Sequence, residues 1–427
     1  MYWLYNVVVF TIFLFSLPYL LVRGIFGRHG LRQRFGFLPK QIRRQLPIEN
    51  LVWVHAASIG EVRVIPSLLT AIGKQRGLNF IISTSTKTGY ALAGELFKNK
   101  ARFIFYQPLD LPFITRKVAS LIDPKALLLV ETELWPNLIK SARRQGALVG
   151  MVNGRISSRS FTRYKVIRSL TQEVLNYIDF FAIQTETDLH RLNQLGARVN
   201  RMKVVGSLKF DQSIQNLPKP SDLTRQTLGI PEGWSVLVAG STRPGEEQIV
   251  LSAYRKLQEQ KQIVLILAPR HLDRIAEIEL LMQQGKFNYL KRSQLTNGSS
   301  SRYDILLLDS MGELAQIYSL ADLAFVGGSL VPLGGHNPLE PAVYGIPVLF
   351  GPYMEHTQEA AELLISSGLG FKVRDEEEFL AVVERILRDG LDVKSAAANF
   401  QRALQENSGA AEKTSQFFFA NLNRISG

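Results

Sequence analysis

The chain has 427 residues, of which 46% are hydrophobic, and this is enough material for two ordinary domains with buried cores. It contains no cysteine, which excludes disulfides and thiolate chemistry and suits a reducing compartment. Its 50 Lys and Arg residues outnumber its 37 Asp and Glu residues, so the net charge is +13. Where these basic residues lie along the chain decides which anionic partner they favour.

The first segment, from Tyr2 to Val22, carries no charged residue. A hydrocarbon core needs roughly 20 apolar residues to be crossed, so this segment is expected to be a membrane anchor. Asn6, Ser16 and Pro18 leave open whether the helix spans the membrane or lies at its interface. A cleaved signal peptide is disfavoured, because no basic residues precede the apolar run and no small-residue cleavage site follows it.

A basic segment follows and completes residues 1–44, the expected anchor and juxtamembrane region. No acidic residue occurs before Glu49, and seven basic residues account for more than half of the net charge: Arg23, Arg28, Arg32, Arg34, Lys40, Arg43 and Arg44. The positive-inside rule then predicts that the rest of the chain lies in the cytoplasm. Attraction to anionic headgroups, about 1 kcal/mol per basic residue, makes a membrane surface a better partner than nucleic acid.

Short apolar runs then alternate with amphipathic stretches, which is typical of strand–helix units. The runs expected to be strands in a first series are 51–56, 80–86, 102–106, 126–131, 147–153 and 180–185. Those expected in a second series are 235–241, 263–269, 304–309, 323–329 and 346–351. Between the two series, residues 211–234 carry three prolines and little periodicity, so they are the predicted linker.

Continuous apolar strands are typical of parallel sheets that are covered on both faces. The sequence therefore predicts an α/β protein with two Rossmann-like domains, residues 45–210 and 235–427, and a ligand cleft between them. Open parallel sheets bind ligands at the carboxyl ends of their strands. The residues that follow each strand are thus the candidates for a functional site.

Three glutamates follow strands of the first series. Glu61, in HAASIGE, lies at a glycine-containing turn where a carboxylate can take a proton from a sugar hydroxyl. The same residue fits a capping box with Ser58, so a purely structural role stays open. Glu131 and Glu133, in ETELWPN, follow another strand at the same edge, and one is expected to face the site while the other bonds locally.

Cationic and polar residues follow other strands. Lys209, in GSLKFD, ends the first series, where a cation can stabilise negative charge on a phosphate leaving group. Arg270, in APRH, offers bidentate donors to a phosphate or a carboxylate. GSTRPGEE, residues 240–247, is expected to open a helix near Pro244, and DSMGE, residues 309–313, fits a capping box that could line a base pocket.

The stretch GGHNPLEP, residues 334–341, has the composition of a nucleotide-phosphate pocket. With Asn337 as cap and Pro338 at the first helical position, it predicts a helix whose N-terminal amides point toward a bound anion. Glu340 could accept hydrogen bonds from ribose hydroxyls. The same spacing also fits a helix cap without a ligand.

Some motifs are missing from the sequence. It has no Asp-x-Asp pair for a divalent metal, no phosphate-binding G-x-x-x-x-G-K-[ST] loop and no G-x-S-x-G nucleophile elbow. His55, His271 and His336 lie on separate segments without ligand spacing. The sequence therefore favours a mechanism without a metal or cofactor at the protein site.

Taken together, the motifs resemble the Kdo transferases, which are membrane-anchored glycosyltransferases of the GT-B fold. The resemblance runs in order from about His55 to Pro352 and is carried by HAASIGE, ETELWPN, NGRIS, GSLKFD, AGSTRPGEE, APRH, DSMGE and VGGSLVPLGGHNPLEP. It implies transfer of 3-deoxy-D-manno-octulosonic acid (Kdo) from CMP-Kdo to a lipid A precursor, lipid IVA, with inversion and without metal. It also implies a place in lipopolysaccharide core biosynthesis at the cytoplasmic face of the inner membrane.

The resemblance also implies roles for single residues. Glu61 would be the general base, and Glu131 and Lys209 would stabilise the transition state. The residues implied to bind CMP are Pro269, Arg270, Met311, Gly312, Glu313, Asn337, Pro338, Leu339 and Glu340. Arg243 stands where the family's AGSTH segment has His, and NGRIS replaces the more usual NARLS. These departures bear on donor-side detail and acceptor preference.

Two other interpretations stay open. A UDP-sugar-dependent transferase could use the same fold, because the fold alone does not determine the donor. A non-catalytic, basic, membrane-bound protein could bind anionic lipid or nucleic acid with the same basic segment.

Overall fold

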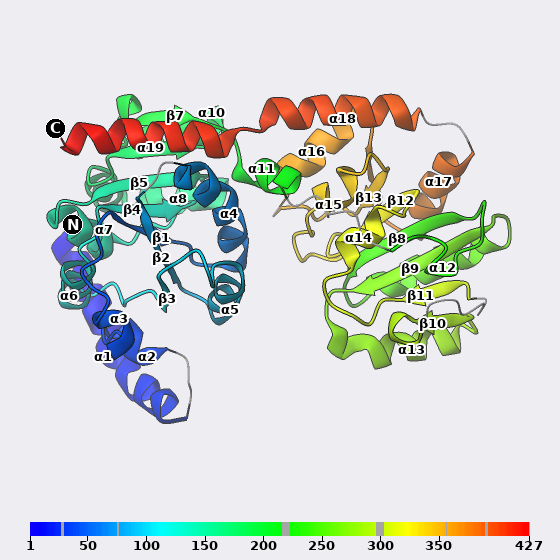
Figure 1. The fold of residues 1–427 in the computed structure, drawn as a ribbon, viewed down its shortest axis with the longest axis horizontal. Coiled ribbons are helices and arrows are strands. Elements are labelled where there is room, and N and C mark those ends of the chain that lie inside the picture. Colours follow the sequence, from blue (N-terminus) through cyan, green and yellow to red (C-terminus); the bar gives the residue numbers. More distant parts are fainter. Residues whose placement is uncertain are drawn as a thin grey trace. The chain divides into compact units, whose positions relative to one another are not determined.

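The chain folds into two compact α/β units in a computed structural model that describes residues 1–26, 30–74, 77–215, 223–295, 303–355, 357–388 and 392–426. The first unit comprises Met1–Gln212 and Asn407–Gly427, and the second comprises Ser213–Glu406. Each unit contains a seven-stranded sheet in which neighbouring strands are parallel (Figure 1). The predicted pair of parallel α/β domains is confirmed.

The first sheet has the strand order β3-β2-β1-β4-β5-β6-β7. Its strands are β1 (Leu51–His55), β2 (Asn79–Thr84), β3 (Phe103–Tyr106), β4 (Ala126–Val130), β5 (Leu148–Gly154), β6 (Phe180–Ile183) and β7 (Met202–Val204). Its helices are α1 (Tyr2–Phe26), α2 (Leu31–Arg34), α3 (Lys40–Arg43), α4 (Ile59–Gly73), α5 (Lys87–Leu96), α6 (Pro112–Ile122), α7 (Pro136–Arg144), α8 (Ser158–Val166), α9 (Arg168–Leu175), α10 (Glu186–Gln194), α11 (Leu208–Gln215) and α19 (Ala410–Ser426).

The second sheet has the strand order β10-β11-β9-β8-β12-β13-β14. Its strands are β8 (Ser235–Thr242), β9 (Ile263–Pro269), β10 (Tyr289–Lys291), β11 (Ile305–Leu307), β12 (Leu323–Val326), β13 (Val348–Phe350) and β14 (Gly370–Lys372). Its helices are α12 (Glu246–Gln258), α13 (Ile275–Gln284), α14 (Leu314–Tyr318), α15 (Leu339–Ala342), α16 (Gln358–Ser367), α17 (Glu376–Leu387) and α18 (Val393–Asn407).

Alternating residues of the central strands face two different hydrophobic cores. In β1, Leu51 and Trp53 lie in one core cluster, while Val52 and Val54 lie in the other. Successive side chains of a strand point to opposite faces, so an uninterrupted apolar run is what a sheet covered on both faces requires. Helix α7 contributes to the cluster of Leu51 and Trp53, and helix α4 contributes to the cluster of Val52 and Val54.

Every predicted strand is present, and the structure adds three that the sequence analysis missed: β7, β10 and β14. All three lie at edges of the sheets. Most of their residues are only half-buried or are exposed, in contrast to the fully buried β1 and β9. An edge strand need not be continuously apolar, so the pattern used to find the inner strands did not mark these.

The predicted domain boundaries need two corrections. Helix α19 belongs to the first unit rather than to the C-terminal domain, because Phe418 and Leu422 are buried in the core formed by α4 and the first sheet. In Figure 1, α19 (red) accordingly runs beside elements of the first unit. The predicted linker is also shorter, because Leu228 and Ile230 are buried in the core of the second unit. Residues 216–222 of that linker lie outside the described residues.

The structure does not support a membrane-spanning form of the predicted anchor. Within the described residues, no helix has the length and apolarity needed to cross a membrane. The first turns of α1 pack on the first unit instead. Tyr5 Oη donates a hydrogen bond to Asp110 Oδ2 (2.7 Å), and Asn137 Nδ2 donates one to Asn6 Oδ1 (2.8 Å). Tyr2 is buried, and its hydroxyl donates to the Pro136 carbonyl.

The basic residues that follow α1 differ in their surroundings. Arg34 lies 4.9 Å from the centre of the Tyr106 ring and donates a hydrogen bond to the Ser85 carbonyl, so it holds α2 against the first unit. Four others are exposed: Arg32, Lys40, Arg43 and Arg44. The side chain of Arg23 and the whole of Arg28 lie outside the described residues.

Candidate active site

The predicted carboxylates of the first unit gather where the strand order of its sheet reverses. β1 pairs with β2 on one side and with β4 on the other, and the chain order runs outward from this pair. Ligands of open α/β sheets bind at such a point, beyond the carboxyl ends of the strands. Glu61 follows β1, and Glu131 and Glu133 follow β4. The three therefore lie at the expected position for a site.

Glu61 is buried in the first turn of α4, with an exposed fraction of 8%. Its Oε2 accepts a hydrogen bond from Ala57 N (2.6 Å), and its Oε1 accepts one from Ser58 Oγ (2.8 Å). The capping-box prediction is thus half correct, because Glu61 reaches back to the start of the helix but the Ser58 side chain does not cap it. These contacts fix the orientation of the carboxyl group.

The surroundings of Glu61 raise its pKa to about 8. Burial is the largest cause, followed by the negative charges of Glu133 and Glu131, while the hydrogen bonds from Ala57 and Ser58 act in the opposite direction. A carboxyl group of this kind exchanges its proton close to neutral pH. It is therefore suited to general acid–base chemistry.

Glu133 lies at the same edge of the sheet as Glu61, but its pKa shifts in the opposite direction. Although burial opposes its ionisation, its pKa is lowered, because His55 lies close and Trp135 Nε1 donates a hydrogen bond to Oε2 (2.7 Å). His55 Nε2 is 3.7 Å from Glu133 Oε2, so the imidazole lies next to this carboxylate. Glu133 therefore stays ionised and keeps the Glu61 proton bound more tightly.

His55 is a site residue to which the sequence analysis gave no role. It is fully buried, and its Nδ1 lies 2.8 Å from Ser83 Oγ, which also accepts a hydrogen bond from Trp53 Nε1 (2.7 Å). With Trp53 as donor, Ser83 can give its own proton to Nδ1, and the His55 proton then sits on Nε2, facing Glu133. Its position at the last residue of β1 was the only signal in the sequence.

Three non-glycine residues at strand ends adopt left-handed backbone conformations. They are Glu131 (φ 60°) after β4, Asn153 (φ 54°) in β5 and Ser241 (φ 58°) in β8. Such residues are uncommon, and they concentrate where a structure must aim a side chain at a particular point. All three lie at the carboxyl edges of the sheets, so both edges carry this sign of a functional site.

Lys209 is brought to the edge of the first sheet by Asn153. The Asn153 Oδ1 atom accepts a hydrogen bond from Leu208 N (3.0 Å), which ties the start of α11 to the end of β5. Lys209, the second residue of α11, is half-buried there. The structure therefore places it at the same edge as the glutamates.

An apolar pocket of about 330 Å³ opens beside Glu133. Tyr5 of α1 lines it together with Leu134, Trp135, Tyr164 and Ile167. A carboxylate, an apolar cavity and the N-terminal helix are thus next to one another in the first unit.

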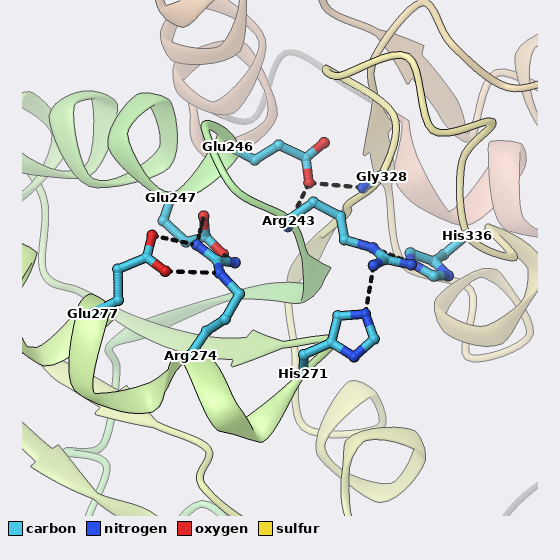
Figure 2. A network of polar contacts seen from close by, with 8 residues as sticks. All are labelled: Arg243, Glu246, Glu247, His271, Arg274, Glu277, Gly328 and His336. Carbon is cyan, nitrogen blue, oxygen red and sulfur yellow. Dashed lines mark hydrogen bonds and ion pairs between the residues drawn. The ribbon is translucent and has the colours of Figure 1, made fainter. Parts of the chain in front are cut away.

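The second sheet reverses its strand order at β8 and β12. Glu246, in the first turn of α12, is fully buried, and its carboxylate accepts hydrogen bonds from the backbone nitrogens of the loop that follows β12: Gly328 (2.7 Å), Ser329 (2.9 Å) and Leu330 (2.8 Å). It also accepts one from Arg243 N (2.9 Å), as Figure 2 shows in part. Glu246 therefore joins the two turns at the switch point, and α12 begins at this residue rather than at Pro244.

The side chain of Arg243 points away from Glu246 and toward two imidazoles (Figure 2). Its Nε lies 3.3 Å from His336 Nε2, and its Nη1 lies 2.6 Å from His271 Nε2. The sequence analysis assigned no ligand to this trio. Arg243 was visible only as a departure from the family pattern.

The residues implied to bind CMP lie at the end of β9, on the segments that follow β9, β11 and β12, and in the first residues of α15. Pro269 ends β9, and Arg270 N donates a hydrogen bond to Thr242 O (3.1 Å). Met311 is 69% exposed beside Gly312, which has a φ of 92°. Glu313 accepts hydrogen bonds from Arg292 Nη2 (3.0 Å) and from the Ser310 hydroxyl.

The helix predicted after Asn337 is a single turn, α15. The Asn337 cap is present, because Leu339 N donates a hydrogen bond to Asn337 Oδ1 (3.2 Å). Glu340 lies close enough to Tyr344 that its charge, added to the effect of burial, raises the pKa of the Tyr344 hydroxyl to about 12. A four-residue helix adds little dipole, so an anion bound at its N-terminus would depend on individual N–H donors.

In the part of the chain that the structure describes, no group of three or more His, Cys, Asp or Glu side chains is arranged to hold a metal ion.

Comparisons with known proteins point to one family. The family model described as 3-deoxy-D-manno-octulosonic-acid transferase (kdotransferase) matches residues 29–212. The 3-deoxy-D-manno-octulosonic acid transferase of Haemophilus influenzae is 31% identical over 395 residues, which cover 90% of this chain and 90% of that protein. A bifunctional glycosyltransferase/methyltransferase of Fusobacterium nucleatum is 40% identical over 344 residues, 79% of this chain and 53% of that protein, so the chain spans about half the length of this relative.

The fold is shared more widely. The structure of UDP-GlcNAc 2-epimerase from Neisseria meningitidis bound to UDP-GlcNAc matches with a TM-score of 0.59, covering 88% of this chain and 100% of that one. The identity is 14%, so this likeness concerns the fold alone.

Proposed function

The chain belongs to the 3-deoxy-D-manno-octulosonic acid transferase family, and from this we propose that it transfers Kdo from CMP-Kdo to a lipid A precursor. The observation that carries the proposal is Glu61, a buried carboxyl group with a pKa of about 8 at the switch point of the first sheet. In a group transfer from a sugar nucleotide to a hydroxyl, a base of this kind can take up the proton of the acceptor.

In the proposed reaction, the ionised Glu61 accepts the proton of an acceptor sugar hydroxyl. The hydroxyl oxygen forms a bond to the anomeric carbon of Kdo as the bond to the CMP phosphate oxygen breaks, and the configuration inverts. The negative charge of Glu133, which stays ionised, makes Glu61 a stronger base. Glu131 and Lys209 stabilise the charges that develop in the transition state.

CMP is assigned to the loops of the second unit. Arg270 supplies a cation at the end of β9, and Glu313 is held by Arg292 beside the exposed Met311. The residues assigned to CMP are Pro269, Arg270, Met311, Gly312, Glu313, Asn337, Pro338, Leu339 and Glu340. We infer that cations of the protein neutralise the departing phosphate and that no metal is required at the protein site.

The acceptor is assigned to the first unit. Its lipid character is supported by the pocket of about 330 Å³ beside Glu133, whose lining includes Leu134, Trp135 and Ile167. A cavity of this kind can hold part of an acyl chain, at a gain of about 0.8 kcal/mol for each buried methylene group.

Contact with the cytoplasmic face of the inner membrane belongs to the same proposal. One face of α1 exposes large apolar side chains, among them Trp3 (76%), Ile12 (62%) and Phe15 (84%). The exposed Arg32, Lys40, Arg43 and Arg44 follow, so an apolar face and a basic segment are adjacent in the chain. We propose that this region lies at the interface, as an amphipathic element does, without crossing the bilayer.

The test is turnover of CMP-Kdo with lipid IVA, together with calorimetric titration of CMP, UDP and a short DNA duplex in the presence of a chelator. We expect turnover and metal-independent binding of CMP in preference to UDP. Preferential binding of UDP, with no Kdo transfer, would refute the proposal in favour of a UDP-sugar transferase. Binding of the DNA duplex alone would favour a non-catalytic basic protein.

A further inference from the structure

The guanidinium of Arg243 is held by two imidazoles rather than by a carboxylate. Its Nε is 3.3 Å from His336 Nε2, and its Nη1 is 2.6 Å from His271 Nε2 (Figure 2). A guanidinium can only donate hydrogen bonds, so both Nε2 atoms must be acceptors. Both imidazoles are then neutral and carry their proton on Nδ1.

The two neutral imidazoles that bind Arg243 therefore do not balance its positive charge. Other arginines of the second unit are paired with carboxylates: Arg225 with Asp322, Arg274 with Glu247 and Glu277, Arg292 with Glu313, and Arg388 with Glu384. Figure 2 shows the contrast between Arg274, held between two glutamates, and Arg243. Among the described residues, no carboxylate lies at ion-pair distance from Arg243, and its Nη2 has no described protein partner.

The backbone around Arg243 is built to hold it in this place. Its nitrogen is bound by the buried Glu246, and Gly328 lies against it with a left-handed φ of 69°. A Cβ atom at Gly328 would come within 3.1 Å of His336 Cδ2 and 3.8 Å of Arg243 Cγ. The loop after β12 therefore approaches the Arg243–His336 pair as closely as a glycine allows.

Arg243 also has a cationic neighbour. Thr242 of β8 is in register with Pro269 of β9, so Arg243 and Arg270 are the residues that directly follow two paired strands. The carboxyl edge of the second sheet thus carries two arginines whose backbones are neighbours. CMP-Kdo carries two anionic groups, the phosphate diester and the carboxylate of its sugar acid.

We propose that Arg243 binds the carboxylate of the Kdo moiety and so selects a sugar-acid donor, with His271 and His336 as its positioning residues. This inference rests on the proposed function. Arg270 serves the phosphate, and Arg243 presents its remaining N–H donors to the second anion as a charge-assisted, bidentate contact. A neutral sugar nucleotide would leave the charge of Arg243 without an anionic partner, which favours a sugar-acid donor over a neutral one.

The test compares CMP, which lacks the sugar carboxylate, with CMP-Kdo, by calorimetry on the full chain without acceptor. Arg243→Ala should weaken CMP-Kdo about 10- to 100-fold, the loss expected for a charge-assisted contact, and CMP less than about threefold. Arg243→Lys should restore part of the CMP-Kdo affinity. Arg388→Ala removes the same charge from an exposed ion pair of the same unit and should change neither.

The positioning role has its own readout. His271→Gln keeps an acceptor near the place of Nε2 and should retain more CMP-Kdo affinity than His271→Ala, with CMP affinity unchanged in both. Thermal melting of each variant identifies a general loss of folding. Equal weakening of CMP and CMP-Kdo in Arg243→Ala would overturn the carboxylate assignment, and so would an unchanged affinity for both. A wild-type chain that binds neither ligand would refute the proposed function itself.

Discussion

The two sheets reverse their strand order in the same manner, but the turns that follow their strands carry different charged side chains. Beyond β1 and β4, the first unit holds Glu61, Glu131 and Glu133. Beyond β8 and β9, the second unit holds Arg243 and Arg270. The topology therefore determines where side chains meet, whereas a few turn residues determine whether the edge is acidic or cationic. This division matches a reaction in which one partner must lose a proton and the other leaves as an anion.

The largest effect is expected when the acidic carboxyl edge of the first sheet loses its proposed base. Glu61→Gln keeps the shape of the side chain, and its amide can accept a hydrogen bond from Ala57 N and donate one to Ser58 Oγ, but it cannot take up the acceptor proton. We expect turnover of CMP-Kdo to fall by about 10² to 10⁴. CMP affinity and thermal stability should stay near the wild-type values, because CMP is assigned to the other unit.

Glu186→Gln is the matched control for this change. Glu186 also lies in the first turn of a helix that follows a strand of the first sheet, but it is exposed. This variant should keep wild-type turnover. If Glu61→Gln retained a tenth of wild-type turnover or more, Glu61 would be a helix-capping residue, and Glu133 would become the candidate base.

The cationic edge is tested by CMP binding. Arg270→Ala removes a charge-assisted contact and Glu340→Ala removes the proposed ribose acceptor, so each should weaken CMP by about 1.5 to 3 kcal/mol. Calorimetry measures both. Glu61→Gln is the reciprocal control and should bind CMP as the wild type does. Unchanged affinity in both variants would mean that this edge is not the nucleotide site.

The proposed membrane contact is made by α1, which belongs to the first unit, and the second unit is not expected to take part in it. Phe15→Ser removes an 84% exposed apolar side chain from α1, and Leu280→Ser removes a 54% exposed one from the second unit. We expect the first change to lower the partition coefficient onto anionic lipid vesicles, measured by flotation, by about 10- to 100-fold, since inserting such a side chain is worth roughly 1.5 to 3 kcal/mol. The second change should have no effect. Equal flotation of both variants and the wild type would place the membrane contact elsewhere.

The inner strands of both sheets could be predicted from the sequence, whereas the edges and boundaries could not. β1 and β9 are uninterrupted apolar runs because both of their faces are buried. β7, β10 and β14 lie at the edges and lack this pattern. Helix α19 was assigned to the wrong unit, because an amphipathic helix does not indicate which core it will cover.

The residues of the site also separate into those that the sequence predicted and those that it did not. Glu61 and Arg270 could be found because each follows a predicted strand at a recognisable turn. The pairing of His55 with Glu133 and the Arg243 trio depend on neighbouring strands that are distant in the sequence. Local spacing carries no information about such contacts. The length of the helix after Asn337 could not be predicted either, because nothing in the sequence reveals that α15 is a single turn.

The smallest expected effect concerns the pKa of Glu61 and how the neighbouring glutamates raise it. Glu61 must be ionised to accept a proton, so kcat/KM should fall as the pH drops below its pKa of about 8. Glu133→Gln removes the larger of the two neighbouring charges that raise this pKa, and the acidic limb of the profile should move to lower pH. Burial still raises the pKa in this variant, so the shift should be partial. Glu131→Gln should move the limb in the same direction but less, and Glu186→Gln should not move it. A limb that stays in place in Glu133→Gln, or one that persists in Glu61→Gln, would show that another group controls the pH dependence.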